Sequence, residues 1–369
     1  MTPTLTNRTK SKLTAALMAA TIASAGAIAL PTSAAFAVPA GGYADLVDSV
    51  TPSVVFIEVT EKAMPASAES QMLQQFQQRF GGQMQIPQQN GPRTGVGSGF
   101  IISAEGDIVT NNHVVDGATE VKVKLSDGRS FDATVVGRDP MTDVALLRIT
   151  TGESLQAVKF GSSDSIRVGD EAIAVGNPFG LGGTVTTGII SAKSRDIHSG
   201  PFDNYIQTDA AINKGNSGGP LFNSDGEVIG MNTAIFSPDG GSVGIGFAVP
   251  ADMVKSVVAD LADDGSIDRG WLGVQIKPMS EEVAAVLGYD TPKGAVIESV
   301  QPDSPAAKAG FKAGDIVLSF AGQSIDTLRD LPRVVAGTDP ETKQHVTLLR
   351  KGAEVELEVT LGHLPKQDA

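Results

Sequence analysis

The sequence contains no cysteine among its 369 residues. Disulfides, a thiol nucleophile, a cysteine-based zinc site and a lipidated cysteine anchor are therefore excluded. The four histidines are not arranged as a metal cluster, so neither a metal nor any other cofactor is expected. The fold must be held together by its own core.

Basic and aromatic residues are also scarce. The chain has 28 Lys and Arg against 42 Asp and Glu, a net charge of −14. This balance argues against nucleic acid as a partner and discourages contact with anionic membranes. Aromatic residues make up only 5% whereas there are 42 glycines, which favours a turn-rich β architecture. The length predicts two or three folded units.

The N-terminus has the organisation of an export signal. Three basic residues precede an Ala-rich apolar stretch, 13–30, and Ala35-Phe36-Ala37 then offers a small-x-small cleavage site. A membrane span needs roughly 20 apolar residues, and this stretch is short and diluted with small polar residues. We expect residues 1–37 to be a cleaved signal peptide, leaving no stable membrane anchor; an uncleaved anchor is the alternative.

The most informative segment is Gly215-Asn216-Ser217-Gly218-Gly219-Pro220. Glycines on both sides of the serine let the backbone turn tightly, so that Ser217 Oγ can point into a cleft. The same turn aims backbone N–H groups, those of Gly215 and Ser217, at one point where they can bind the oxyanion of a tetrahedral intermediate. Glycines also make ordinary turns, so the interpretation depends on partners for the serine.

A serine hydroxyl becomes a good nucleophile only beside a base, usually a histidine. Only His113 lies in a suggestive context, Thr110-Asn111-Asn112-His113-Val114-Val115, after an expected strand. Asp143 directly precedes an apolar run, which could place its carboxylate at a cleft edge to orient the imidazole. Alone, these would be an ordinary loop histidine and a turn carboxylate. Together, in the order His113, Asp143, Ser217, they predict a catalytic triad.

The same serine motif also matches the nucleophile elbow of α/β-hydrolases. That fold places its histidine after the serine and begins a helix directly behind it. Here Gly218-Gly219-Pro220 is a poor helix start, and the later histidines, His345 and His363, fall in what reads as a separate module. The elbow is therefore disfavoured.

Short β runs recur between turn signals such as Asp127-Gly128 and Asp225-Gly226. With no long helix between them, they predict two six-stranded barrels with the cleft between, closed by a helix over 252–261. The expected strands are 53–59, 96–102, 121–125, 131–136, 144–149, 172–175, 185–191, 228–232 and 244–249.

With these motifs, the chain resembles the HtrA/Deg (Do-like) family of periplasmic serine endoproteases. Besides the segments around His113 and Ser217, the similar ones are Thr142 to Leu147, Ala174-Val175-Gly176-Asn177-Pro178-Phe179-Gly180, Gln207 to Asn213 and Gly244 to Pro250. The resemblance implies a chymotrypsin-like double β-barrel followed by a PDZ-like α/β domain, all-β dominated overall. It also implies the triad His113, Asp143 and Ser217, with an oxyanion hole lined by Gly215, Asn216 and Ser217.

We therefore expect a signal peptide over 1–37, a trypsin-like serine protease domain over 44–262 and a PDZ domain over 270–363. The protease domain would carry a Gln-rich loop over 62–93. Such a loop is a floppy insertion or, as the resemblance suggests, takes part in oligomer assembly through Phe76 and Phe80. A homotrimer or higher oligomer is expected by analogy.

In the C-terminal region, Trp271-Leu272-Gly273-Val274 resembles a PDZ carboxylate-binding loop. The N–H groups of Leu272, Gly273 and Val274 could capture a peptide C-terminus while the peptide adds as a strand. Trp271 serves packing or peptide binding. Ser304, with Pro305 behind it, reads as a helix N-cap and Gly310 as the C-cap.

The resemblance also points to specificity and regulation. Ile212, Phe236 and Ile245 match positions that shape the S1 pocket, where apolar walls would favour aliphatic P1 residues; each is otherwise simply core. Arg195 matches an activation-loop arginine that reports PDZ occupancy, or is a solvated loop residue.

The implied function is ATP-independent degradation of unfolded or misfolded proteins in the periplasm, with chaperone activity as a possible accompaniment. C-terminal peptides would regulate it through the PDZ domain. Two alternatives stay open: a chaperone or binding scaffold without significant proteolysis, and a membrane-tethered regulatory protease.

Overall fold

The computed structural model describes residues 42–61, 93–177, 183–200, 202–213, 215–237 and 241–365. The expected signal peptide and residues 62–92 of the Gln-rich loop, with Phe76 and Phe80, lie outside them. By their contacts, Met1–Asp45 and Leu46–Ala369 form separate units. All elements below lie in the second unit, except the start of helix α2 (Ala44–Val50), which leads into the 3-10 turn η1 (Thr51–Ser53).

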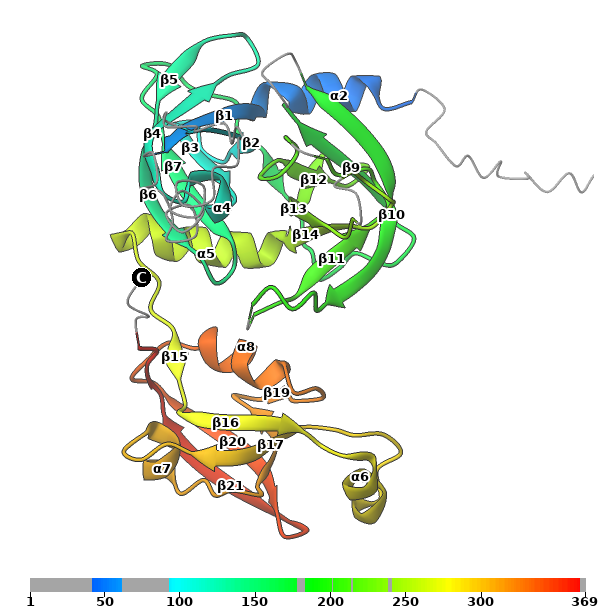
Figure 1. The fold of residues 1–369 in the computed structure, drawn as a ribbon, viewed down its shortest axis with the longest axis vertical. Helices are drawn as coiled ribbons and strands as arrows, with labels where there is room; N and C mark the ends of the chain where they lie inside the picture. The colour runs from blue at the N-terminus through cyan, green and yellow to red at the C-terminus, as the bar shows by residue number, and fades with distance from the viewer. Residues whose placement is uncertain are drawn as a thin grey trace, which may run out of the picture. The chain divides into compact units, whose positions relative to one another are not determined.

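Seven antiparallel strands form the first barrel, in the order β5-β4-β1-β2-β3-β7-β6 (Figure 1). They are β1 (Val54–Glu61), β2 (Arg93–Ile101), β3 (Asp107–Thr110), β4 (Ala118–Lys124), β5 (Ser130–Asp132), β6 (Thr134–Asp139) and β7 (Val144–Arg148). Alternate residues of β1, Val55, Ile57 and Val59, enter one apolar core with Ile108 and Leu147, as the two-residue period of a strand requires.

The second barrel closes through six strands, in the order β12-β9-β10-β11-β14-β13 with β13 paired back to β12. They are β9 (Glu171–Gly176), β10 (Thr184–Arg195), β11 (Tyr205–Thr208), β12 (Pro220–Phe222), β13 (Glu227–Ile235) and β14 (Gly246–Pro250). A two-residue strand, β8 (Lys159–Phe160), adds in parallel to β13. The expectation of six strands per barrel is therefore wrong for both sheets, although six strands make the closed part of the second.

Helix α5 (Ala251–Asp264) packs against strands of both barrels: β6 and β7 in the first, β13 and β14 in the second. Val254, Val257 and Leu261 are the buried stripe that makes these contacts. Gly265, at φ +81°, ends the helix as a left-handed C-cap. The helix predicted over 252–261 is confirmed and extends one residue earlier and three later.

The C-terminal module combines a five-strand path, β16-β17-β18-β20-β21, with three short helices. Its elements are β15 (Gly270–Trp271), β16 (Val274–Pro278), α6 (Glu281–Leu287), β17 (Ala295–Val300), α7 (Pro305–Ala309), β18 (Ile316–Phe320), β19 (Gln323–Ser324), α8 (Asp330–Ala336), β20 (Lys343–Arg350), β21 (Ala353–Thr360) and β22 (Gly362–His363). Ser304 Oγ accepts from Ala307 N at 3.1 Å, and Gly310 ends α7 at φ +85°, so both predicted caps are confirmed.

The all-β dominated fold with a smaller α/β module is confirmed. Both predicted hairpin turns are present: Gly128 N donates to Leu125 O between β4 and β5, and Gly226 N to Asn223 O between β12 and β13. The expected strand over 131–136 is divided at Ala133, whose N–H turns to Val121 O. Within the described ranges, no helix has the length and apolar character needed to cross a membrane.

Candidate active site

Asp143 lies between β6 and β7 and is the most heavily hydrogen-bonded side chain of the site. Its Oδ1 accepts from His113 N at 2.9 Å, and its Oδ2 lies 2.8 Å from His113 Nδ1 and accepts from Thr233 Oγ1 at 2.6 Å. Its carbonyl accepts from Asn112 N and Asn111 Nδ2. The backbone is left-handed, φ +57°, a conformation that costs a residue with a Cβ about 1–2 kcal/mol. These five contacts hold it there.

His113 belongs to α4 (Asn112–Val115), a single turn that follows β3. Its side chain is 49% exposed and that of Asp143 is 20% exposed. Because Nδ1 faces the Asp143 carboxylate, Nδ1 carries the proton in the neutral ring and Nε2 is left as the acceptor. This is the tautomer that a general base requires.

Ser217 lies on the other barrel, in the loop between β11 and β12. The strand that follows the loop, rather than a helix, agrees with the rejection of an α/β-hydrolase elbow. Gly218 donates to Asn232 O at 2.8 Å and Gly219 to Asn216 O at 2.9 Å. A Cβ on Gly218 would lie 2.2 Å from Ser98 O, so only glycine permits this approach to the first barrel.

The Ser217 loop and the His113–Asp143 pair meet at shared neighbours. A Cβ on Gly218 would also lie 3.2 Å from Asn111 N, two residues before His113. Asn232 binds Gly218, while the adjacent Thr233 binds Asp143. The three predicted residues therefore converge on one inter-barrel region. In the part of the chain that is described, no hydrogen bond joins Ser217 Oγ to His113.

The three candidate oxyanion-hole residues differ in their backbone N–H groups. Asn216 N donates to Asn213 O at 3.0 Å, and Gly215 has φ +100°. The N–H of Asn216 is thereby occupied. The N–H groups of Gly215 and Ser217 make no hydrogen bond to any described residue, so these two are the available donors.

Four polar residues of the site escaped the sequence-based prediction: Ser98, Asn111, Asn232 and Thr233. All four are buried, with exposures of 7% or less. For two of them, a sequence signal exists: Asn232 and Thr233 form a polar pair between the apolar residues Met231 and Ala234 of strand β13. Buried polar groups need hydrogen-bond partners, so such a pair indicates specific contacts.

Tyr205 and Asp203 form a polar group on the strand-β11 side of the second barrel. Burial raises the pKa of Tyr205, and the hydrogen bond between its hydroxyl and that of Ser199 offsets this only in part. The pKa of Asp203 is lowered although burial opposes the shift, because Ser199 and Ile197 donate to its carboxylate. Asp203 therefore stays ionised and holds the Ile197–Ser199 turn, just after Arg195.

The three expected S1 residues occupy different surroundings. Ile212 is 2% exposed and belongs to the core of the second barrel. Phe236 N donates to Ile245 O at 3.0 Å, but the Phe236 side chain is 63% exposed. Gly246 contacts Ile212, and a Cβ there would lie 2.7 Å from Ile212 Cγ1. The assignment of these three residues to an S1 pocket stays a prediction.

Arg195 ends β10, exposed to solvent, and its Nε donates to Gln207 Oε1 at 2.8 Å. Its regulatory role also stays a prediction.

Leu272, Gly273 and Val274 line a groove of about 320 Å³, most of whose lining belongs to the C-terminal module. The groove runs beside β16 and α8, and Ile276, Leu331 and Val335 are among its apolar lining. Gly273 has φ +78°, and a Cβ there would lie 2.3 Å from Ser304 Cβ and 3.0 Å from Trp271 Cζ2. Trp271 thus lies close to the turn and also lines the groove. Its role in peptide binding stays a prediction.

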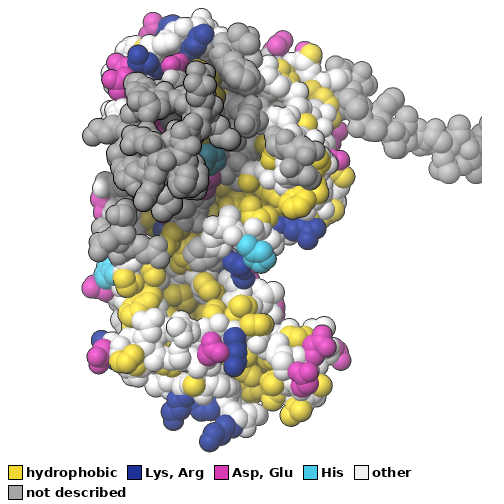
Figure 2. Space-filling view, viewed as in Figure 1, with side chains coloured by type: hydrophobic (Ala, Val, Ile, Leu, Met, Phe, Trp, Pro, Cys, Tyr) yellow, Lys and Arg dark blue, Asp and Glu magenta, His cyan; other side chains and the backbone are white. Residues whose placement is uncertain are grey.

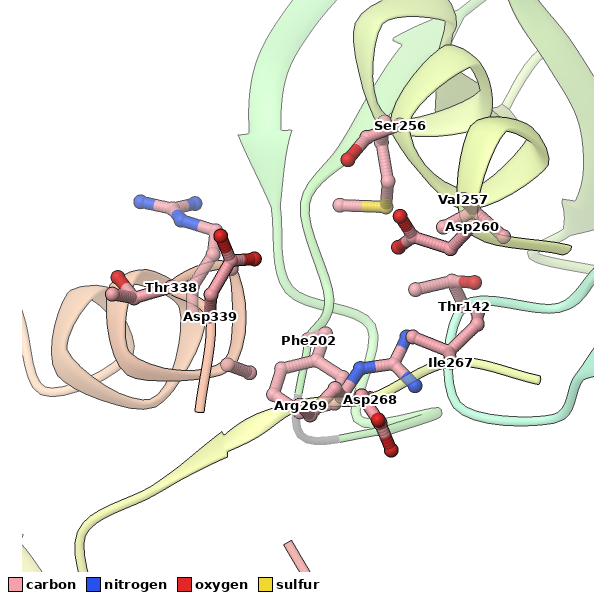
Figure 3. Close-up of a pocket in the computed structure, with 14 residues that line it drawn as sticks. Thr142, Phe202, Ser256, Val257, Asp260, Ile267, Asp268, Arg269, Thr338 and Asp339 are labelled. Carbon is pink, nitrogen blue, oxygen red and sulfur yellow. The ribbon is translucent and has the colours of Figure 1, made fainter. Parts of the chain in front are cut away.

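A second cavity, of about 250 Å³, lies beside the loop that carries Asp143 (Figure 3). Thr142, Phe202, Asp260 and Arg269 are among its lining residues. Arg269 is paired with Asp139, their side chains 10% and 4% exposed, and its guanidinium lies 5.0 Å from the centre of the Phe202 ring. Asp139 also accepts from Thr142 N at 3.1 Å, so this ion pair braces the turn before Asp143.

Charged side chains on the face seen in Figure 2 occur in small separate groups, with acidic, basic and hydrophobic side chains interspersed. The described ranges contain no group of three or more His, Asp and Glu side chains placed to hold a metal. The site itself offers a hydroxyl, an imidazole, a carboxylate and backbone amides.

The comparisons with known proteins agree with this geometry. A family model described as a trypsin-like peptidase domain matches residues 97–231, and one described as a PDZ domain matches residues 270–361. A protein of Brucella suis biovar 1, named a probable periplasmic serine endoprotease DegP-like, is 46% identical over 357 residues, covering 89% of this chain and 70% of the relative.

Two solved structures of an HtrA-type protease, AlgW, are similar over 88% of this chain. The one with a tripeptide has a TM-score of 0.75 and 40% identity and is covered to 98%. The one with a decapeptide has a TM-score of 0.71 and 39% identity and is covered to 100%. On the fold, the inter-barrel site and these similarities, the chain belongs to the HtrA-type, DegP-like family of serine endoproteases.

Proposed function

We propose that this serine endoprotease cleaves unfolded or misfolded proteins in the periplasm without ATP, using Ser217, His113 and Asp143. The single observation that carries the proposal is the Asp143 carboxylate, which binds both the backbone and the ring of His113 and fixes its tautomer. The periplasmic location rests on the names of the relatives and on the expected signal peptide at 1–37.

The proposed mechanism follows from these contacts. Ser217 Oγ attacks the scissile carbonyl carbon and gives its proton to His113 Nε2. The imidazolium is stabilised by Asp143, and the N–H groups of Gly215 and Ser217 stabilise the oxyanion. His113 then protonates the leaving amine, and water, activated by the same base, hydrolyses the acyl-enzyme. Because no Ser217–His113 hydrogen bond is formed in the described structure, we infer that substrate binding tightens this pair.

The second proposed element is peptide binding at the PDZ groove. Two solved relatives carry a tripeptide and a decapeptide, and the groove beside β16 has the apolar lining that a peptide side chain needs. We propose that a peptide C-terminus binds at Leu272 to Val274 and regulates proteolysis, with Arg195 as the candidate relay. A homotrimer or larger assembly, with residues 62–93 taking part, belongs to the same proposal.

A casein-digestion assay on wild type and Ser217→Ala tests the proposed chemistry. We expect Ser217→Ala to lower turnover by several orders of magnitude, because the oxyanion donors alone give only a small residual rate. Retained proteolysis by a clean Ser217→Ala preparation would contradict the assignment. An aggregation-suppression assay on the same two proteins separates chaperone action, which Ser217→Ala should keep, from proteolysis.

A further inference from the structure

Ser98, in β2 of the first barrel, holds the loop of the second barrel that carries Ser217. It is fully buried, at 0% exposure. Its backbone N–H donates to Ser217 O at 2.9 Å, and its hydroxyl donates to Gly215 O at 2.5 Å. It therefore contacts both residues whose N–H groups are available for an oxyanion.

The direction of the Ser98 hydroxyl is fixed. Its oxygen accepts from Asn177 N at 2.8 Å, which leaves its single proton for Gly215 O. The backbone of Ser98 is held as well, because Thr110 Oγ1 donates to Ser98 O at 2.7 Å. The donor to Gly215 is thus a preorganised group with no freedom to rotate away.

The Gly215 carbonyl needs such a partner. Asn216 N is held by Asn213 O, and a peptide group is planar, so a bond at each end of the Gly215–Asn216 peptide fixes its plane. With that plane fixed, the direction of the Gly215 N–H depends only on the two dihedral angles of Gly215. A glycine at φ +100° has many alternatives to its observed conformation. The Ser98 hydroxyl limits these alternatives by holding the Gly215–Asn216 plane in place; without that bond, the plane and the Gly215 N–H could turn together.

The other donor is held differently. Ser217 N–H belongs to the Asn216–Ser217 peptide, whose carbonyl accepts from Gly219 N at 2.9 Å. That bond is backbone to backbone and survives any side-chain substitution. The Ser98 hydroxyl, by contrast, is a side-chain contact to a donor residue, and a substitution can delete it.

We propose that Ser98 is a positioning residue for the oxyanion hole, which acts through Gly215 and never touches substrate. The proposal rests on the proposed role of Ser217 and its neighbouring amides. Ser98, a residue of the first barrel, thereby orients a backbone donor of the transition-state site on the second barrel. This role predicts a loss of catalytic rate out of proportion to any loss of stability or of substrate binding.

Ser98→Ala is the primary test, with Ser163→Ala as the matched control. Ser163 is also buried, at 4%, and its hydroxyl likewise donates once, to Asp252 Oδ2, and accepts once, from Asp252 N, but it lies outside the site. We expect Ser98→Ala to lower kcat on a chromogenic peptide about 10- to 100-fold, a smaller loss than that caused by deleting an oxyanion donor itself. KM should change less than about two-fold. Ser163→Ala should lower Tm by a similar amount and keep kcat.

A second readout separates positioning from general disorder. A peptide aldehyde forms a hemiacetal whose oxygen occupies the oxyanion hole, so its affinity should fall in parallel with kcat. The affinity of the matching uncleaved peptide, measured in the Ser217→Ala background, should stay the same with and without Ser98→Ala. Equal losses in both affinities would overturn the proposal, as would a wild-type kcat in folded Ser98→Ala.

Ser98→Cys covers the case in which Ser98→Ala does not fold, because a thiol fills the space and is a weak donor. If both variants fold, Ser98→Cys should give a kcat between those of wild type and Ser98→Ala. If only Ser98→Cys folds, its kcat should be lower than that of wild type. A kcat of Ser98→Cys equal to that of wild type would contradict the proposed role of Ser98. Ser217→Ala, assayed beside these variants, keeps the two proposals apart. If Ser217→Ala is inactive and Ser98→Ala is fully active, only the role of Ser98 fails; an active Ser217→Ala removes the proposed function itself.

Discussion

At the residue scale, Asp143 shows how the fold stabilises an unfavourable conformation at a functional position. Left-handed backbone is uncommon for aspartate, and here it turns the carboxylate toward His113 while the carbonyl accepts from Asn111 and Asn112. The second barrel contributes one bond, from Thr233 Oγ1 to the same Oδ2 atom that faces His113 Nδ1. The orientation of His113, the proposed general base, thus depends on Thr233, which lies 90 positions after Asp143.

Thr233→Val tests this contribution. Valine has nearly the shape of threonine but cannot donate, so Asp143 Oδ2 loses one partner and the carboxylate gains freedom to rotate. A hydrogen bond to a charged group contributes about 1.5 kcal/mol or more, which predicts a fall in kcat of roughly 10-fold. Steady-state kinetics on a chromogenic peptide checks it. Thr119→Val, which deletes a hydroxyl bonded to Thr60 O elsewhere in the first barrel, should leave kcat unchanged; equal effects of the two variants would contradict the assignment.

The predictable part of the site is the part with a local signature. Ser217 stands in its own glycine-rich loop, and His113 and Asp143 follow or precede apolar runs, so residue type, order and spacing indicated all three. Ser98 carries no local signature, and the polar pair that contains Thr233 does not indicate its partner, because the partners of Ser98 and Thr233 lie 117 and 90 residues away. Contacts at such separations depend on how the two barrels pack, which no short pattern encodes.

At the element scale, length decided which strands could be predicted. The long apolar runs that became β1, β7 and β13 were expected at nearly their observed positions. Strand β12 was expected over Leu221-Phe222, within its observed bounds. Strand β8 was not expected, because two residues are too few to show an alternating pattern. Strand β3, of four residues, was expected only as a strand before His113, without defined bounds.

In the first turn of helix α5, the carboxylate of Asp252 stabilises the fold to an extent that depends on pH. Burial alone would raise the pKa of Asp252, but hydrogen bonds from Lys255, Ser163, Asp164 N and Ser162 outweigh it and lower the pKa to about 2. The pKa is lower in the folded than in the unfolded chain, so the ionised carboxylate stabilises the fold above pH 3.8 and loses its effect as the pH falls toward 2.

We therefore expect Asp252→Asn to lower the free energy of unfolding by about 1 kcal/mol at pH 7, after allowance for solvent screening of a carboxylate that is 30% exposed. The difference from wild type should shrink as the pH falls from about 4 to 2. Urea unfolding at pH 7, 4 and 2.5 measures it. Asp263→Asn, an exposed position on the same helix, is the control and should differ little from wild type at any of these pH values. A difference that grows on acidification would contradict the assignment.

At the scale of the whole molecule, the residues proposed for proteolysis and those proposed for peptide binding lie in separate parts of the chain. The recurrence of short strands was enough to predict the barrels, and the smaller C-terminal module was expected from its resemblance to a PDZ domain. The strand pattern could not predict how one affects the other, because Arg195 and the groove beside β16 have no shared sequence pattern. The proposed coupling between the groove and the protease domain has to be tested by substitutions in the groove and at Arg195.

Gly273→Ala should abolish stimulation of casein digestion by a peptide with an apolar C-terminal residue, because the added Cβ would lie 2.3 Å from Ser304 Cβ at the carboxylate-binding turn. Basal digestion should persist. Gly352→Ala is the matched control, since Gly352 has a similar positive φ, +83°, but open space around its Cα; it should keep the stimulation. If the peptide accelerates wild type and Arg195→Ala equally, the relay through Arg195 is wrong.

The distribution of the three proposed catalytic residues has a consequence for synthesis. The imidazole and the carboxylate belong to the barrel that is made first, and the hydroxyl belongs to the one made second. A nascent or truncated chain that has completed only its first barrel therefore has a base without a nucleophile. Cutting ability arises only when both halves have joined, so a half-made copy cannot damage itself or its neighbours during translation and export.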